Sequence, residues 1–85
     1  MQYVYVLQSL KDNNFYTGCT DNLNKRLKKH NNSKVKSTKN RKPLKLIYYE
    51  ACVDKGDAFA REKYLKSGMG KRYIKNRLKR YLLDL

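Results

Sequence analysis

Five side chains that could act together on a phosphate group follow one another along this chain: Tyr5, Tyr16, Arg26, His30 and Glu62. A guanidinium presents a planar fork of donors that matches phosphate oxygens. A single carboxylate can hold Mg²⁺, which keeps several of its waters, and a phenol or an imidazole can move a proton. Because cleavage of a phosphodiester needs these functions together, we expect a hydrolytic site if the fold gathers the five residues.

The group that accepts the proton from water stays open at this level. A phenol is a poor base at its unperturbed pKa of about 10, although nearby cations or a metal would lower that pKa. His30 has an unperturbed pKa of about 6.5, so it could take the proton itself or orient a tyrosine. Without such neighbours Tyr5 and Tyr16 would be ordinary strand residues, and Arg26 an ordinary surface residue of a helix.

The two tyrosines lie on the predicted strands of a β-hairpin. Residues 3–7 are β-branched, aromatic or aliphatic, which favours a strand, and residues 11–14 are turn-forming Lys-Asp-Asn-Asn. Residues 15–18 then form the returning strand. Since side chains alternate along a strand, Tyr5 takes the face opposite Val4 and Val6, and the tyrosines of the two strands can project to one side.

Arg26 and His30 lie on a predicted helix that follows this hairpin. The Asp-Asn pair at residues 21–22 offers a side chain to cap its first turn. Leu23 and Leu27 are one turn apart and mark the buried stripe. Arg26 and His30 are also four residues apart, so they lie one above the other beside that stripe.

Glu62 lies on a second predicted helix, over about residues 57–66. Its apolar stripe contains Ala58, Phe59 and Leu65, and the spacing places Glu62 on the same stripe. A carboxylate there is costly unless something pairs with it. An ion pair with one of the many Lys or Arg residues is one explanation, and a metal ligand facing a cleft is the other.

A strong positive charge indicates a polyanionic partner. Lys and Arg number 21 against 7 Asp and Glu, which gives a net charge of +14, and nucleic acid is the commonest such partner. A merely soluble basic surface and a ribosome-associated protein are the alternatives. The basic residues that we expect to contact nucleic acid lie in a mobile loop at residues 33–42 and on a third helix: Lys34, Lys36, Lys39, Arg41, Lys71, Arg72 and Lys75.

The remaining elements are a third strand at residues 44–52 and that third helix, at about residues 71–83. Gly68 is expected to adopt the left-handed conformation that ends the preceding helix. The apolar face of the third helix contains Ile74, Leu78, Tyr81, Leu82 and Leu85.

The chain length of 85 residues allows one small domain. Cys19 and Cys52 give neither a disulfide framework nor close metal-ligand spacing, so we expect reduced thiols. No apolar run approaches the roughly 20 residues of a membrane span, and no signal peptide is evident. We therefore expect a cytoplasmic protein without a membrane partner.

Several stretches of this chain resemble the GIY-YIG endonuclease superfamily, in particular its small stand-alone members and the nuclease domain of the repair excinuclease. Tyr3-Val4-Tyr5 and Tyr16-Thr17-Gly18 correspond to the two triplets that name the family, except that Tyr3 replaces a glycine. The other matching stretches are Asp21-Asn22-Leu23-x-x-Arg26-Leu27-x-x-His30, Lys42-Pro43-Leu44-Lys45-Leu46-Ile47-Tyr48 and Arg61-Glu62-Lys63-Tyr64-Leu65-Lys66.

This resemblance implies an α+β fold in which about three helices pack on a three-stranded antiparallel sheet, in the order β-β-α-β-α-α, as one domain over residues 1–85. It implies that Glu62 binds a single Mg²⁺ or Mn²⁺, and it makes Asn76 a candidate for a further site residue. The other catalytic residues that it implies are Tyr5, Tyr16, Arg26 and His30.

The implied activity is metal-dependent endonucleolytic cleavage of nucleic acid, DNA rather than RNA, in repair or recombination. A protein partner or a homodimer would supply specificity. The alternative is a non-catalytic basic module that binds branched DNA or structured RNA, which the altered first triplet favours. The presence of all five site residues favours an enzyme, because binding alone does not need them. These residues are Tyr5, Tyr16, Arg26, His30 and Glu62.

Overall fold

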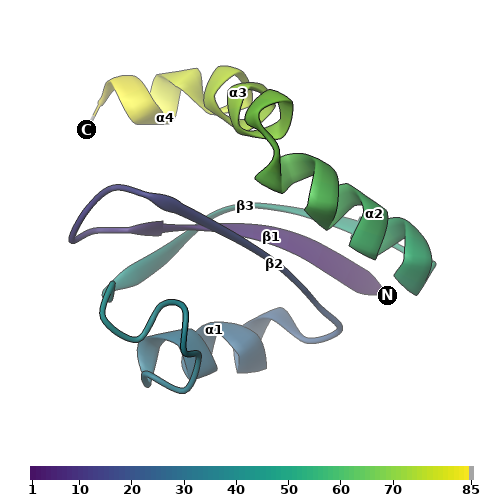
Figure 1. Ribbon diagram of the computed structural model, residues 1–85, viewed down its shortest axis with the longest axis horizontal. Helices are drawn as coiled ribbons and strands as arrows, with labels where there is room; N and C mark the ends of the chain where they lie inside the picture. The colour runs from purple at the N-terminus through teal and green to yellow at the C-terminus, as the bar shows by residue number, and fades with distance from the viewer. Residues whose placement is uncertain (85) are drawn as a thin grey trace.

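A three-stranded antiparallel sheet forms the centre of the protein (Figure 1), whose computed structural model describes residues 1–84. Its strands are β1 (Gln2–Ser9), β2 (Phe15–Thr20) and β3 (Leu44–Cys52), in the order β2-β1-β3. The central strand β1 pairs antiparallel with both neighbours, so β2 and β3 are the edges. This arrangement confirms the predicted α+β fold.

Helices cover both faces of the sheet (Figure 1). Helix α1 (Leu23–Asn31) lies on one face, and α2 (Lys55–Lys66), α3 (Gly68–Arg77) and α4 (Lys79–Leu83) follow one another over the other. Strand β1 is therefore buried from both sides, which explains its nearly continuous apolar sequence.

The alternation predicted for β1 divides the core into two clusters. Val4 and Val6 face the α2–α3 side, where they pack with Ala58, Leu65 and Ile74. Tyr5 faces the other side of the sheet, where a second cluster lies under α1. That second cluster consists of Tyr5, Leu7 and Leu44, with Leu23, Leu27, Leu46 and Tyr16 packed against it.

The second helix differs from the prediction at its start and on its surface. Helix α2 begins at Lys55, earlier than expected, because the Asp54 carboxylate accepts a hydrogen bond from the Asp57 amide (3.0 Å) and caps it. Phe59 was expected in the apolar stripe but is 52% exposed, so that expectation was wrong. Ala58 and Leu65 are seven residues apart and share the buried face, whereas Phe59 is rotated one position away from it.

The prediction for Gly68 was also wrong. The turn before it is made by Ser67, whose backbone is extended and whose hydroxyl accepts a hydrogen bond from the Gly70 amide (3.2 Å). Gly68 is consequently the first residue of α3, and none of the glycines within residues 1–84 has a positive φ.

The predicted third helix is two helices, since the chain departs from helical geometry at Leu78. Residues 1–84 therefore form four helices where about three were expected. Ile74 is buried and Leu78 partly buried, as predicted, whereas Leu85 lies outside the described residues. Across residues 1–84, none of the helices combines the length and the apolar character needed to cross a bilayer.

Candidate active site

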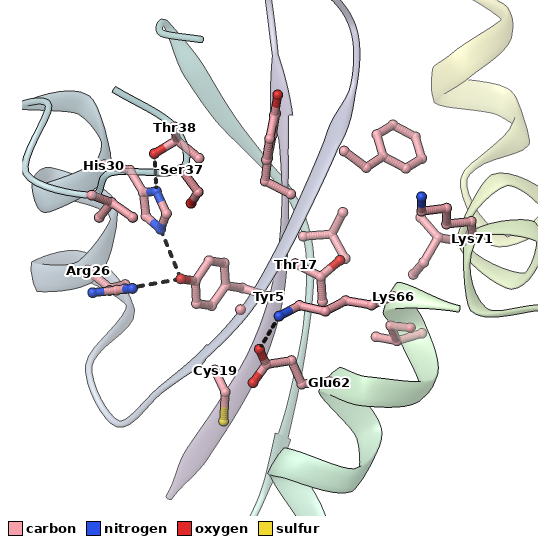
Figure 2. A pocket seen from close by; sticks show the side chains of 17 residues that line it. Tyr5, Thr17, Cys19, Arg26, His30, Ser37, Thr38, Glu62, Lys66 and Lys71 are labelled. Carbon is pink, nitrogen blue, oxygen red and sulfur yellow. Dashed lines mark hydrogen bonds and ion pairs between the residues drawn. The ribbon is translucent and has the colours of Figure 1, made fainter. Parts of the chain in front are cut away.

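An open cleft of about 430 Å³ straddles the edge strand β2 and brings both faces of the sheet into one site (Figure 2). Tyr5, Arg26 and His30 line it from the α1 side. Glu62 and Lys66 line it from α2, on the opposite face. Residues that lie far apart in the sequence therefore share one solvent-filled space.

The Tyr5 hydroxyl is the centre of a hydrogen-bonded network. Arg26 Nε donates to Tyr5 Oη at 3.2 Å, and Tyr5 Oη is 2.9 Å from His30 Nε2. Both partners come from α1, whose first turn is capped by the Asn22 side chain. The predicted stacking of Arg26 and His30 one turn apart is confirmed, and it places both groups on the same oxygen.

Two members of this network, Tyr5 and His30, are buried, whereas Arg26 is half-buried. Tyr5 is 3% exposed and His30 4%. The second ring nitrogen of the histidine, Nδ1, is 2.7 Å from Thr38 Oγ1. Burial, and to a lesser extent the Arg26 guanidinium, lowers the pKa of His30 from 6.5 to about 4. The imidazole is therefore neutral at pH 7 and can accept a proton.

Gly18 allows the Tyr5 phenol to cross β2 and reach the cleft. The two residues are paired across the β1–β2 ladder. A Cβ atom at position 18 would lie only 2.5 Å from the ring carbon Cζ of Tyr5, far inside van der Waals contact. The absent side chain of Gly18 thus provides the path along which the phenol projects.

Glu62 faces the cleft but is already paired with a cation. Its Oε2 lies 2.7 Å from Lys66 Nζ, one helical turn further along α2, and its side chain is 20% exposed. The ion-pair explanation of Glu62 therefore holds in this structure, together with the predicted position in a cleft. A metal that binds the carboxylate competes with the ammonium group for its negative charge.

The donor set fits Mg²⁺ or Mn²⁺ better than zinc. Residues 1–84 contain no group of three or more His, Cys, Asp or Glu side chains that could hold a metal ion. Mg²⁺ accepts a single carboxylate with several waters, whereas zinc requires three or four protein ligands. Both ring nitrogens of His30 are engaged, and burial, together with the Glu62 charge, raises the pKa of the Cys19 thiol. Glu62 is therefore the residue that could hold a metal.

Tyr16 shares the face of Tyr5, as predicted, but not its hydrogen bonds. The ring packs against the cluster that contains Tyr5, and it lines the cleft. Its hydroxyl donates to Asp12 Oδ2 at 3.5 Å, in the turn between β1 and β2. Tyr16 therefore lies at the mouth of the site, separate from the Tyr5 network.

The departure from the family triplet at Tyr3 leaves the cleft unaltered. Tyr3 does not line it. Instead, its ring packs edge-on against Tyr49 of β3, with centroids 6.0 Å apart.

The basic residues predicted on the third helix separate into two groups. Lys71 and Lys75 line a second cleft of about 370 Å³, whose other walls include Phe15 and Tyr16. Lys71, Phe15 and Tyr16 also line the main cleft, so the two clefts are adjacent. Arg72 lies in a different depression of the surface. Its predicted contact with nucleic acid stays a prediction.

The segment at residues 33–42, expected to be a mobile loop, is tethered to the fold. The side chain of Asn31 bonds both backbone groups of Leu44, and Arg41 forms an ion pair with Asp12 at 3.2 Å. Thr38, in its middle, is fully buried against His30. The exposed cations of this segment are Lys34, Lys36, Lys39, Arg41 and Lys42.

Sequence reasoning missed two cleft residues and misplaced a third. Lys66 could have been found, because it lies four residues after Glu62 on the same helix. Thr38 gave no signal, since nothing distinguishes it from the other polar residues of its segment. Asn76 lies on α3 but does not line the cleft that contains Tyr5 and Glu62, so its candidacy as a site residue is not supported.

Comparisons with known proteins identify the family to which this chain belongs. The family model of the GIY-YIG catalytic domain matches residues 1–76. The chain therefore belongs to the GIY-YIG family, whose domain is nuclease-like.

Individual relatives agree with this assignment. The UPF0213 protein CPE1444 of Clostridium perfringens is 49% identical over 67 residues, which cover 78% of this chain and 71% of that protein. The UPF0213 protein SH2523 of Staphylococcus haemolyticus is 42% identical over 76% of this chain and 79% of its own length. The solution NMR structure of the UPF0213 protein BH0048 from Bacillus halodurans superposes with a TM-score of 0.53 at 36% identity, covering 87% of this chain and 82% of that one.

Proposed function

We propose that this protein is a divalent-metal-dependent endonuclease that hydrolyses phosphodiester bonds, in DNA rather than RNA. One observation carries the proposal. The Tyr5–Arg26–His30 network and the Glu62 carboxylate come from opposite faces of the sheet and line the same cleft across β2. Binding of phosphate by the cations of this cleft, Arg26, Lys66 and Lys71, gives no reason for a carboxylate beside them, because a carboxylate repels phosphate unless a metal lies between them.

Arg26 would bind the scissile phosphate and stabilise the charge that grows on it. Its Nε is occupied by Tyr5, and its two terminal nitrogens make no hydrogen bond within residues 1–84. Those nitrogens can therefore donate to phosphate oxygens while Nε holds the phenol in position. Arg26 would thus contact both the Tyr5 phenol and the scissile phosphate.

Tyr5 would take the proton from the attacking water and pass its own proton to His30. A phenol oxygen has one donor and two acceptor positions. Arg26 fills one acceptor position and His30 Nε2 takes the donor position, which leaves one lone pair for the water. The water O–H bond breaks as Tyr5 Oη gains that proton, and the Tyr5 O–H bond breaks as Nε2 gains the other. The hydroxide then attacks phosphorus, and the leaving oxygen departs.

The low pKa of His30 fits this sequence of proton transfers. At about 4 it keeps the ring neutral before substrate binds. A bound phosphodiester anion next to Arg26 offsets part of the guanidinium charge, which raises the pKa of His30 when the proton has to be accepted. Both ring nitrogens of His30 are engaged, by Tyr5 and by Thr38, so Tyr5, which keeps a free lone pair, is the group that would meet the water.

Glu62 would hold Mg²⁺ or Mn²⁺ after Lys66 leaves it. When bound, the metal supplies positive charge for the phosphate and for the leaving oxygen. The freed ammonium of Lys66 lines the same cleft, so it stays available to a phosphate of the substrate. Tyr16, at the mouth, would position water or phosphate.

The nucleic-acid backbone would run from the main cleft into the second one. Lys71 and Lys75 line this route, and point charges along a groove are the usual means of neutralising successive phosphates. The exposed loop cations Lys34, Lys36 and Lys39 extend the positive surface on the α1 side. Arg41, which is paired with Asp12, would contribute less. From the family alone, we assign the activity to repair or recombination, with specificity supplied by a protein partner or a second copy.

The test is cleavage of supercoiled plasmid and of a panel of branched DNAs in Mg²⁺, Mn²⁺ or EDTA. Wild type is compared with Glu62→Gln and with Asp57→Asn, a matched control on the exposed side of α2. We expect metal-dependent cuts that Glu62→Gln abolishes and Asp57→Asn retains. If DNA and RNA are bound but neither is cut, the protein is a non-catalytic binding module and the proposal fails.

A further inference from the structure

Thr38 is the one fully buried residue of an otherwise polar and largely exposed segment, residues 33–42. Its hydroxyl lies 2.7 Å from Nδ1 of His30, on the side of the ring away from Tyr5 (Figure 2). Its backbone is fixed by hydrogen bonds with Val35 and Arg41. The position of this hydroxyl is therefore set by the whole segment.

The hydrogen bonds of Tyr5 favour one of the two tautomers of His30. Arg26 Nε can only donate, so Tyr5 Oη accepts from it. The phenol is 3% exposed, and within residues 1–84 its proton has no acceptor apart from His30. When the phenol donates to His30 Nε2, a neutral ring carries its own proton on Nδ1. That proton points at Thr38 Oγ1.

From these contacts we infer that Thr38 is a positioning residue, which holds His30 in the tautomer that can accept the Tyr5 proton. The inference rests on the proposed function, since it assigns a role within the same proton transfer. When the proton passes from Tyr5 Oη to Nε2, the ring becomes an imidazolium, and Nδ1–H continues to donate to Thr38. The hydroxyl therefore serves the ring before and after transfer. The Thr38 hydroxyl carries no charge, so it does not trap the proton on His30, and that proton can return to Tyr5.

This arrangement also connects the site to a surface that is proposed to contact nucleic acid. Lys36 and Lys39 flank Thr38 in the same segment and are exposed. Contact of these cations with a phosphate backbone holds the segment in place, and the segment holds the Thr38 hydroxyl on His30.

The test compares Thr38→Val, which keeps the shape and loses the hydroxyl, with Thr38→Ser, which keeps the hydroxyl. Nitrogen-15 NMR of the imidazole reports which ring nitrogen is protonated, and the cleavage rate is measured in parallel. We expect Nδ1 protonation in wild type and Thr38→Ser, and a mixed or reversed signal in Thr38→Val. We expect kcat to fall about 10-fold in Thr38→Val, as for the loss of one hydrogen bond in the transition state, and to recover in Thr38→Ser.

The two readouts separate this inference from the proposed function. If wild type protonates Nε2, or if Thr38→Val matches wild type in both readouts, the inference is wrong even when the nuclease is active. If the protein does not cleave nucleic acid, the proposed function fails, but the NMR comparison still decides whether Thr38 sets the tautomer. Should Thr38→Val not fold, the tautomer of wild type and the rate of Thr38→Ser decide.

Discussion

The backbone of Gly18 lies directly against the phenol ring of Tyr5, so closely that a Cβ at position 18 would fall 2.5 Å from Tyr5 Cζ. The last residue of the second triplet and the last residue of the first are thus a packing pair across the β1–β2 ladder. This pairing gives a physical reason for a glycine at that position: any side chain would occupy the space through which the phenol reaches the cleft.

Gly18→Ala should displace the Tyr5 phenol and abolish most of the cleavage. Gly18 is half-buried, but the added methyl group overpacks the buried Tyr5 ring, which costs about 1–3 kcal/mol of unfolding free energy. Gly68→Ala is the matched control, because nothing lies within 4 Å of a Cβ there. That change should leave cleavage intact and stabilise α3 by about 0.5–1 kcal/mol. Thermal unfolding and the cleavage rate check both expectations.

A second change separates displacement of Tyr5 from general damage to the fold. In a Tyr5→Phe background the hydroxyl is gone, so Gly18→Ala should cost less stability than it does in wild type. Equal costs in the two backgrounds, or an active Gly18→Ala variant, would mean that the phenol does not depend on the space above Gly18.

His30 should make folding stability depend on pH. Its pKa is about 4 in the folded protein, where burial and Arg26 lower it from 6.5. As the pH falls below about 6.5 the unfolded chain binds this proton first, so stability decreases until about pH 4. Between pH 7 and pH 4.5 wild type should lose up to about 2 kcal/mol more than His30→Gln. Urea unfolding at the two pH values measures the difference, and parallel losses in the two proteins would show that His30 is not held neutral.

Removing the Lys66 ammonium should strengthen metal binding at Glu62. The pair at 2.7 Å is a partly exposed i,i+4 ion pair, worth about 0.3–0.5 kcal/mol, so Lys66→Met should tighten Mn²⁺ binding about 2-fold. Lys63→Met is the control for loss of one positive charge on α2, since Lys63 does not line the cleft. Calorimetric Mn²⁺ titration without nucleic acid is the measurement. Identical affinities in the two variants would show that Lys66 does not compete for the carboxylate.

If the DNA backbone passes along Lys71 and Lys75 of α3, replacing either lysine should change the salt dependence of DNA binding. Lys71→Gln and Lys75→Gln should each reduce the slope of log K against log salt by about 1, as expected for the loss of one phosphate contact. Arg72→Gln removes the same charge from a different depression on the surface of α3. If all three variants change the slope equally, the effect is one of net charge, and no defined route exists.

The strands and the faces on which Tyr5, Arg26 and His30 lie were predictable from local sequence, because both depend on short-range patterns. The alternation Tyr-Val-Tyr-Val places Tyr5 opposite Val4, and the four-residue spacing stacks His30 on Arg26. That Glu62 lines the same cleft as Tyr5 was not predictable from such patterns. It depends on α2 and α1 lying on opposite faces of the sheet, and on the cleft passing around an edge strand.

The errors also have physical causes. A glycine after a helix suggested a left-handed end at Gly68, but the Ser67 hydroxyl instead caps the next helix. Phe59 looked like a core residue by its type, although its position on the helix turns it outward. Thr38 is buried only because residues 33–42 fold back onto α1, and that long-range contact leaves no trace in the local sequence.

A double-mutant cycle on cleavage tests most directly whether Tyr5 and Glu62 act as one site. Wild type, Tyr5→Phe, Glu62→Gln and the double variant are assayed on the best DNA substrate in Mn²⁺. Residues that act on the same transition state are strongly non-additive. We predict that each single variant loses nearly all the metal-dependent rate and that the double variant is no slower than the slower single. Independent losses that multiply, or a wild type without metal-dependent cleavage, would contradict the account.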